Sequence, residues 1–117
     1  MAYVRDANRG NYIFELSSNY FRMISDGYSY RIEGDWLYNL NRGYQCRVEG
    51  NYIRSTSRGY ILELVGNMIR SVRSGYIAEI VSGNYIRSLD NSRRYYIECS
   101  ISKMELMMII AVLFGDC

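Results

Sequence analysis

The sequence predicts an all-β protein in which short antiparallel β-hairpins form a ring around an apolar C-terminal helix. Similar segments recur about every sixteen residues, and a unit of that length has room for one two-stranded hairpin. The composition of 13 Tyr, 10 Gly and no Pro is typical of strands joined by glycine turns. The chain also ends in an uninterrupted apolar segment. We expect one domain over residues 1–117, with five or six repeats within about 2–100.

The repeat is clearest in the middle of the chain, where residues 43–55 align with 59–71 and with 75–88. Each unit contains two segments with strand-like alternation. The first kind of segment is predicted at 12–16, 28–32, 44–48, 60–64, 76–80 and 95–99. The second kind is predicted at 3–6, 20–23, 36–39, 52–55, 68–71 and 85–88. A single hairpin cannot bury its own apolar face, so the units must share a core.

Short turns predict that neighbouring strands are antiparallel. The tetrads that follow the second kind of strand, such as 56–59, end in Gly, which suits the positive φ that closes a type I turn with a bulge. Pairs such as Gly50-Asn51 follow the first kind of strand and are typical of two-residue hairpin loops. Connections this short leave no room for a crossover helix.

Alternation assigns the two faces of each strand. In the first kind of strand the first, third and fifth places, such as Tyr76, Ala78 and Ile80, are apolar and are predicted to face the core. The second kind of strand has an inward apolar series and an outward face of aromatic residues and arginines. The candidate binding residues on that outward face are Tyr3, Arg5, Tyr20, Arg22, Trp36, Tyr52, Arg54, Arg70, Tyr85 and Arg87.

The segment 103–114 is predicted to form a helix enclosed by the ring. Beyond Glu105 it is apolar on every side, and such a helix needs burial all round. A membrane anchor is the alternative, but about ten uninterrupted apolar residues fall short of the roughly 20 that cross a bilayer as a helix. We therefore expect no membrane span. Met side chains suit the irregular gaps at the centre of radially arranged hairpins.

The residue types argue against an enzyme. His is absent, which removes the commonest general base and the commonest metal ligand. The three cysteines, Cys46, Cys99 and Cys117, are odd in number and widely spaced, so they predict neither a disulfide framework nor a metal site. We expect Cys46 and Cys99 to be small core residues in a reducing compartment. The sequence predicts no catalytic residue, no metal and no cofactor.

Charge and the N-terminal segment bear on partners and location. The 14 Lys and Arg and the 12 Asp and Glu are scattered along the chain, so no basic arm predicts a nucleic-acid partner. Residues 1–6 lack a charged segment followed by an apolar run, so no signal peptide is expected and a cytoplasmic location is predicted. The sequence does not indicate an oligomeric state.

The glycine-bounded hairpin unit and the apolar tail together resemble the small bacterial beta-flower proteins, which are described in four-fold and five-fold forms. Their turn usually reads like Asp-Ser-Asn-Gly, and it is matched here at 25–27, 41–43, 57–59 and 73–75. The loop at 90–92 loses the Gly, which suggests a seam or an irregular loop. The resemblance implies a fold and no established activity. Tyrosine-aspartate repeats and MORN repeats are looser matches.

The outward Tyr/Arg face predicts a non-enzymatic structural or binding module whose partner is a glycan or a protein. The competing hypothesis is a glycan-directed hydrolase that uses carboxylates of the first kind of strand, in a cleft near Asp90 to Arg94 where the repeat breaks. Those carboxylates recur at Glu15, Glu63, Glu79 and Glu98. Because charges of both signs alternate around the ring, we expect cross-strand ion pairs with Arg22, Arg54, Arg70 and Arg87.

Overall fold

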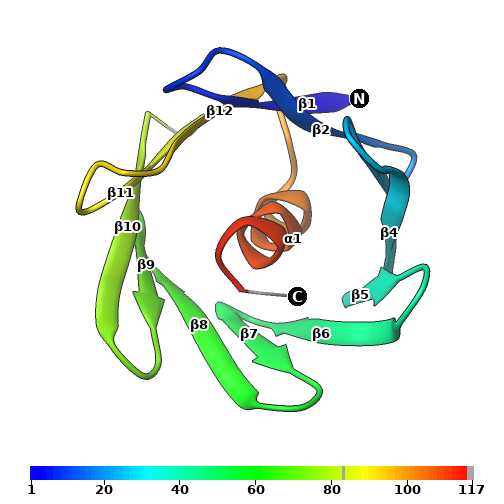
Figure 1. Ribbon diagram of the computed structural model, residues 1–117. Coiled ribbons are helices and arrows are strands. Elements are labelled where there is room, and N and C mark those ends of the chain that lie inside the picture. Colours follow the sequence, from blue (N-terminus) through cyan, green and yellow to red (C-terminus); the bar gives the residue numbers. More distant parts are fainter. Residues whose placement is uncertain (83, 116–117) are drawn as a thin grey trace.

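A computed structural model describes residues 1–82 and 84–115 of the chain. Within this part, twelve strands form a closed ring and a single helix lies inside it (Figure 1). The strands are β1 (Ala2–Asp6), β2 (Tyr12–Ser17), β3 (Tyr20–Met23), β4 (Gly27–Glu33), β5 (Trp36–Asn39), β6 (Gly43–Glu49), β7 (Tyr52–Ser55), β8 (Gly59–Val65), β9 (Met68–Ser71), β10 (Gly75–Val81), β11 (Tyr85–Ser88) and β12 (Arg94–Glu98). The helix is α1 (Lys103–Phe114). The predicted fold class is confirmed.

The ring is closed by the two strands that are farthest apart in the sequence. Every strand pairs antiparallel with its neighbours in the chain, and β1 pairs with β12 so that Val4 lies opposite Ile97. The twelve strands make six hairpins, and all six belong to the ring. Closure leaves no unpaired sheet edge, so each strand has backbone hydrogen-bond partners on both sides.

Alternating connections give the ring two different rims. The loops that join β1 to β2, β3 to β4, β5 to β6, β7 to β8, β9 to β10 and β11 to β12 lie on one rim, which we call the long-loop rim. The two- or three-residue loops between the other consecutive strands form the opposite, short-loop rim. The expected positive φ occurs in both kinds of loop, with 74° at Gly59 and 62° at Gly50.

In every hairpin except the second, where Met23 takes this place, the side chain of the last residue before the long loop accepts a hydrogen bond from the backbone that follows it. In the β5–β6 loop, the buried Asn39 side-chain oxygen accepts hydrogen bonds from the backbone N–H groups of Asn41 and Arg42, at 2.8 and 3.0 Å. Ser55 makes the same contacts in the β7–β8 loop. Asn, Asp and Ser are favoured at this place because their side chains hydrogen-bond the backbone of a turn.

The predicted core position of the first Tyr in each repeat is wrong for five hairpins. In β10, Tyr76 pairs with Arg70 and Ala78 pairs with Ile69, so Ile77 is an extra residue that faces no partner. Such a β-bulge reverses the alternation before it. The Tyr therefore points outward, and Tyr76 is 52% exposed. The tyrosines corrected in this way are Tyr12, Tyr28, Tyr44, Tyr60 and Tyr76.

The sixth hairpin lacks the bulge and shows what the bulge does. Between β11 and β12 the register runs without a shift, with Ile86 opposite Tyr95 and Tyr85 opposite Tyr96. Strict alternation holds here, so Tyr95 faces inward and is only 8% exposed, with its ring edge-to-face against Phe114. The next residue, Tyr96, takes the outward place. The bulge therefore decides which face the first Tyr occupies.

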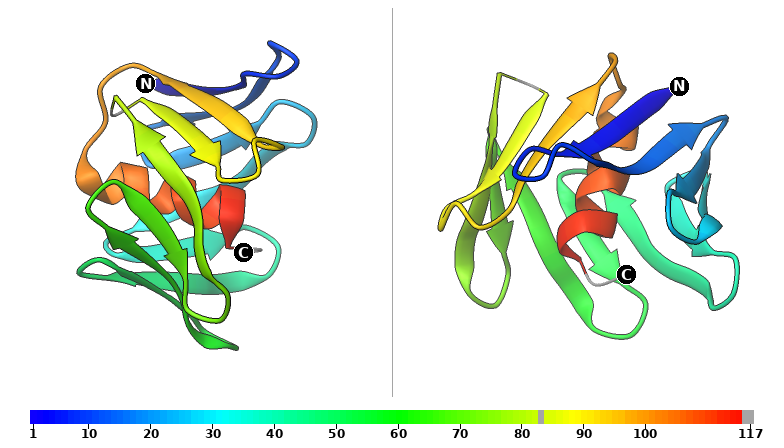
Figure 2. Two further views of the ribbon diagram at one scale, coloured as in Figure 1. Left: turned by 90° about the vertical axis from the view of Figure 1, so that its left-hand side faces the viewer. Right: turned by 45° about the horizontal axis from the view of Figure 1, so that its top comes forward.

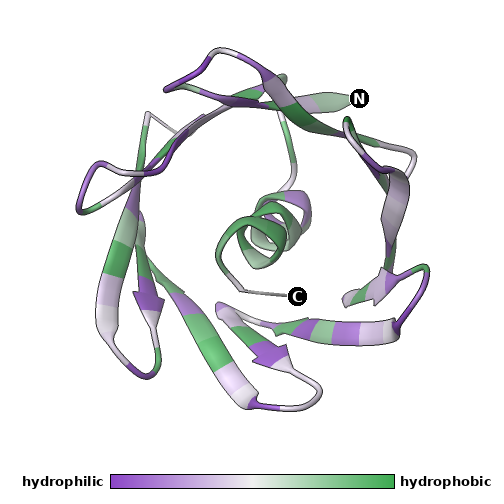
Figure 3. Ribbon diagram, viewed as in Figure 1, coloured by the Kyte–Doolittle hydropathy of each residue, from purple (hydrophilic) through white to green (hydrophobic). Residues whose placement is uncertain are grey.

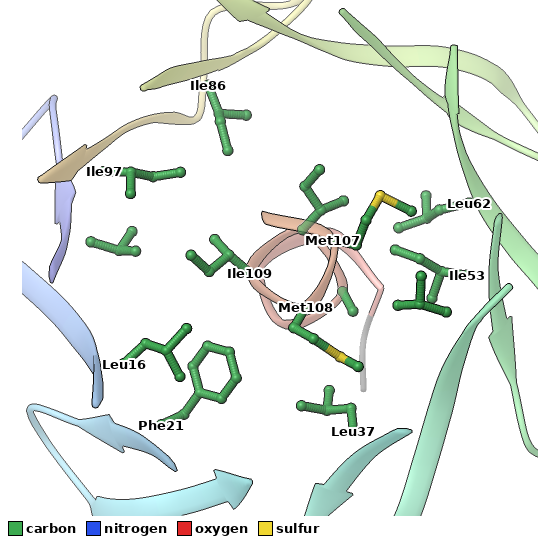
Figure 4. Close-up of a cluster of buried hydrophobic side chains, with 14 of the residues drawn as sticks. Leu16, Phe21, Leu37, Ile53, Leu62, Ile86, Ile97, Met107, Met108 and Ile109 are labelled. Carbon is green, nitrogen blue, oxygen red and sulfur yellow. The ribbon is translucent and has the colours of Figure 1, made fainter. Parts of the chain in front are cut away.

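The core lies between the inward side chains of the ring and the helix. Leu16, Phe21, Leu37, Ile53 and Ile97 converge on the helix (Figure 4). The helix is apolar along most of its length, whereas apolar and polar residues alternate along many strands (Figure 3). This arrangement gives each hairpin a common surface on which to bury its apolar side.

The helix begins and ends where the sequence analysis places it. A capping box at its start joins the Ser102 side chain to the Glu105 backbone N–H and the Glu105 side chain to the Ser102 N–H. Two views show the helix running from one rim to the other (Figure 2). At the long-loop rim the helix carbonyls accept hydrogen bonds from Arg58, at 2.7 Å to the Gly115 oxygen, and from Arg93. These cations face the negative end of the helix dipole.

No helix within residues 1–82 and 84–115 has both the length and the apolar character needed to cross a lipid bilayer. Instead, Met107 through Ala111 are buried inside the ring.

The cysteines separate into different environments. Cys46 is buried in the core, as predicted. Cys99 is exposed, so its predicted core position is wrong. Cys99 follows Glu98, the last residue of β12, and has a φ of 97°. The backbone therefore leaves the sheet at Cys99, and its side chain does not take the inward place that alternation predicts. The third residue, Cys117, lies outside the described residues.

Candidate binding face

The ten candidate residues all belong to strands of the second kind, and their side chains point away from the core. Tyr20 and Tyr52 are 40% and 36% exposed, and Arg54 is also exposed. The remaining seven candidates are partly buried, and none of the ten belongs to the hydrophobic core. We call this outward surface, together with the outward tyrosines of the other strands, the outer face.

Bulges bring a second set of aromatic rings onto the outer face beside the predicted one. Within a hairpin the two rings meet edge to face: Trp36 and Tyr44 have centroids 5.3 Å apart, and Tyr52 and Tyr60 are also 5.3 Å apart. At the unbulged hairpin the rings of Tyr85 and its neighbour on β12 are stacked, with centroids at 4.7 Å. The outer face therefore carries a recurring aromatic pair with arginines beside it.

Sequence reasoning missed the outward tyrosines of the first strands because it assumed unbroken alternation. Their hydroxyl groups were the available signal, because buried Tyr O–H groups need hydrogen-bond partners and an apolar ring interior offers few. On the outer face these groups reach carboxylates. The Tyr12 hydroxyl donates to Glu98 at 3.0 Å, and the Tyr60 hydroxyl donates to Glu49 at 2.9 Å.

Ion pairs join neighbouring strands around most of the outer face. The pairs are Glu15 with Arg22 at 2.6 Å, Glu63 with Arg70 at 2.7 Å, Glu79 with Arg87, and Glu98 with Arg5 at 3.4 Å. All are at least partly exposed, so each contributes about 0–1 kcal/mol to stability. The expected ion pairs are confirmed for Arg22, Arg70 and Arg87, but not for Arg54, which forms no ion pair with a described residue because its cross-strand neighbour is another arginine.

This pattern changes in the second and third hairpins. Arg31 and Arg47 lie where the other four repeats carry a carboxylate. Arg31 forms an ion pair with Glu33 on its own strand, and Arg47 faces Arg54 on the next strand. Asp35 binds Arg47 at 2.9 Å. For Arg54 the structure records no ion pair with any described residue, and its guanidinium lies 5.9 Å from the centroid of the Tyr60 ring.

The outer face is hollowed where β10 and β11 meet the irregular β11–β12 loop. The hollow has a volume of about 800 Å³. Seven of the residues that line it carry side chains able to hydrogen-bond or stack: Asn67, Glu79, Ser82, Tyr85, Arg87, Asn91 and Arg94. Asn67 belongs to the β8–β9 loop, Asn91 to the irregular loop and Arg94 to the start of β12. Tyr85 and Arg87 are predicted binding residues, Glu79 is a carboxylate of the hydrolase hypothesis, and the hollow lies beside the segment 90–94 at which that hypothesis places a cleft. Asn67 and Ser82 were not predicted.

The polar groups of the hollow are only partly satisfied. The Arg87 side chain reaches Glu79 and donates to the Asn91 side-chain oxygen at 3.2 Å, and Arg94 donates to the Asn8 side-chain oxygen at 2.6 Å. The Nε atom of Arg87 is buried and has no hydrogen-bond partner in the described part of the chain. Buried donors are nearly always paired, so this Nε is an exception among the polar groups of the hollow.

Two carboxyl groups of the ring, those of Glu15 and Asp90, have lowered pKa values. The hydrogen bond from Arg22 lowers the pKa of the Glu15 carboxyl group. Hydrogen bonds from Ser92 and Ser88 lower the pKa of Asp90 to about 2. A glycosidase needs a carboxylic acid with a raised pKa and a second carboxylate nearby. Among the described residues that line the hollow, only Glu79 carries a carboxylate.

Within residues 1–82 and 84–115, no three Cys, Asp or Glu side chains gather closely enough to hold a metal ion. Comparison of the chain with protein-family models, with curated proteins and with solved structures found no match. We therefore infer the function from the residues and geometry of this chain.

Proposed function

We propose that this protein is a non-enzymatic binding module that holds a glycan on its outer face, with the hollow beside β10 and β11 as the main contact. The single observation that carries the proposal is the presence in one hollow of an aromatic ring, two guanidinium groups and a buried donor without a partner. Sugar rings combine an apolar face with many hydroxyl groups, and they need both kinds of contact at once.

Each group in the hollow has a role toward such a ligand. Tyr85 offers a ring that is already fixed by stacking on Tyr96, so little side-chain freedom is lost on binding. Arg87 and Arg94 donate hydrogen bonds to hydroxyl oxygens. Glu79 and the Asn91 side chain accept hydrogen bonds from hydroxyl groups. The hollow is large enough for a small oligosaccharide, since ligand sites commonly measure about 300–1,000 Å³.

The test is a glycan array followed by titration of the glycans that are retained. Tyr85→Ala is expected to weaken binding about tenfold or more, which corresponds to about 1.4 kcal/mol. The matched control is Tyr76→Ala, which removes an outward Tyr from the neighbouring strand, outside the hollow. It should weaken binding much less than Tyr85→Ala does. Equal loss in the two variants would contradict a site in the hollow, and retention of no glycan would contradict the proposal.

The hydrolase alternative makes a different prediction for the same samples. A hydrolase would shorten the retained glycans, and Glu79→Gln or Glu98→Gln would abolish that turnover while leaving binding in place. We propose a binder because Glu79 and Glu98 are each paired with an arginine, an arrangement that supports hydrogen bonding to a ligand better than proton donation.

A further inference from the structure

The two rims of the ring differ in charge. The loops of the long-loop rim contain five arginines, Arg9, Arg42, Arg58, Arg73 and Arg93, and two aspartates, Asp26 and Asp90, which gives 5 − 2 = +3. The loops of the short-loop rim contain no Lys or Arg and one carboxylate, Asp35, which gives −1. The repeat therefore concentrates positive charge at one end of the molecule.

Exposed apolar side chains gather at the same end. Ile24, Val72 and Leu89 each occupy the first place of a long loop, and they are 47%, 38% and 47% exposed. The loops of the short-loop rim contain only Ser, Asn, Gly and Asp. Outward tyrosines lie just after the long loops, with Tyr28 62% exposed and Tyr76 52% exposed.

We propose that the long-loop rim docks on the surface of an anionic lipid bilayer. Basic side chains attract acidic headgroups, and aliphatic side chains between them enter the boundary between headgroups and acyl chains. Tyr side chains favour the same depth because one end of the ring is apolar and the other is wet. The ring, with extents of 31 × 30 × 22 Å, presents a broad end to such a surface.

The arginines of this rim are free to meet headgroups. Arg9, Arg42 and Arg73 are exposed, and the structure records no side-chain partner for them among the described residues. Arg58 and Arg93 already contact helix carbonyls, but a guanidinium has five N–H donors and can bind a further oxygen. One oxygen of the Asp90 carboxylate accepts three hydrogen bonds from Ser88 and Ser92 of its own loop region.

A hollow on this rim is suited to a headgroup. It has a volume of about 540 Å³ and lies between the β7–β8 and β9–β10 loops, beside the end of the helix. Arg58, Arg73 and Ser74 supply donors at its edge, and Ile77 and Phe114 contribute apolar surface. Guanidinium and hydroxyl donors beside apolar surface match the phosphate and glycerol portions of a phospholipid.

A nucleic acid or an acidic protein would also be attracted to the positive charge. A nucleic acid does not account for the aliphatic side chains between the arginines, because a phosphate backbone offers them no apolar partner. The lipid surface is favoured because charge and apolar exposure coincide on one rim. This inference involves other residues than the glycan hollow, so either proposal can fail without the other.

The test is co-sedimentation of the full chain with vesicles of phosphatidylcholine alone and of phosphatidylcholine with phosphatidylglycerol. Binding is expected only to the anionic vesicles, and it should weaken as salt is raised. Arg73→Glu should lower the partition coefficient roughly tenfold or more, since each basic residue near a charged bilayer contributes strongly. Arg54→Glu changes the net charge equally but lies on the outer face, and it should have a much smaller effect.

A second pair of variants tests the apolar contribution. Leu89→Ser should weaken vesicle binding, whereas Val65→Ser, at the other end of the ring and 38% exposed, should not. Thermal melting checks that all variants remain folded. Equal binding to neutral and anionic vesicles, equal effects of Arg73→Glu and Arg54→Glu, or preferential binding of a single-stranded oligonucleotide over the anionic vesicles would overturn the proposal.

Discussion

Asp90 holds together the loop at which the repeat departs from its pattern. Its carboxylate accepts hydrogen bonds from the Ser88 and Ser92 side chains, both at 2.7 Å, and from the Ser92 backbone N–H at 3.0 Å. These bonds replace the turn glycine of the other long loops, and Asn91 takes the positive φ, 63°, that glycine adopts elsewhere. The loop is therefore stabilised by a charged group.

The lowered pKa of Asp90 makes this contribution depend on pH. Its folded-state pKa is about 2, below the ordinary value of 3.8, so the contribution to stability is complete above about pH 4 and is lost as the pH falls through 2. We predict that Asp90→Asn lowers the melting temperature at pH 6 and that the difference from the unmodified protein shrinks toward pH 2.

The control for this prediction is Asp26→Asn in the β3–β4 loop. The structure records no hydrogen bond to the Asp26 carboxylate from any described residue. The melting-temperature difference for Asp26→Asn should stay small throughout the titration. A deficit for Asp90→Asn that is the same at pH 6 and pH 2 would contradict the assigned role.

At the scale of the element, the helix supplies the surface on which every hairpin packs. Met107, Met108 and Ile109 are at most 1% exposed, and inward residues from strands all around the ring contact the same cluster. A helix that is apolar on all sides has no stable place in water. The ring and the helix therefore depend on each other for burial.

Removal of the helix should expose the inner face of the ring. We predict that deletion of residues 104–117 produces a protein that binds a hydrophobic dye, aggregates and loses its cooperative thermal transition. Ser102→Ala is the matched control, because it removes only the capping hydrogen bond and should cost about 1 kcal/mol while the fold is kept. A soluble truncation that melts cooperatively would show that the helix is not the core.

The elements could be predicted from the sequence because their signals are local. The turn glycines and the alternation predict every strand to within about one or two residues, and the apolar run predicts the helix at its observed bounds. The side on which each Tyr lies could not be predicted in the same way. A bulge adds the unpaired Ile77 without changing the sequence pattern, so Tyr76 faces outward whereas Tyr95 faces inward.

At the scale of the whole molecule, ring closure is a non-local property. The pairing of β1 with β12 joins segments about ninety residues apart, and no turn signal connects them. The sequence therefore left the number of hairpins at five or six, and the structure has six. The hollow is equally non-local, because it combines a short loop, two strands and the irregular loop. The beta-flower resemblance and the cytoplasmic location stay predictions.

The central claim is that a closed ring of hairpins encloses the helix. Native-state hydrogen exchange measured residue by residue tests it directly, because buried backbone amides in a cooperative core exchange only when the whole protein unfolds. We predict that the amides of Met108 through Ala111 exchange as slowly as those of Ile53 and Ile69, with the same free energy of opening. Rapid exchange of the helix amides while the strands remain protected would contradict the account.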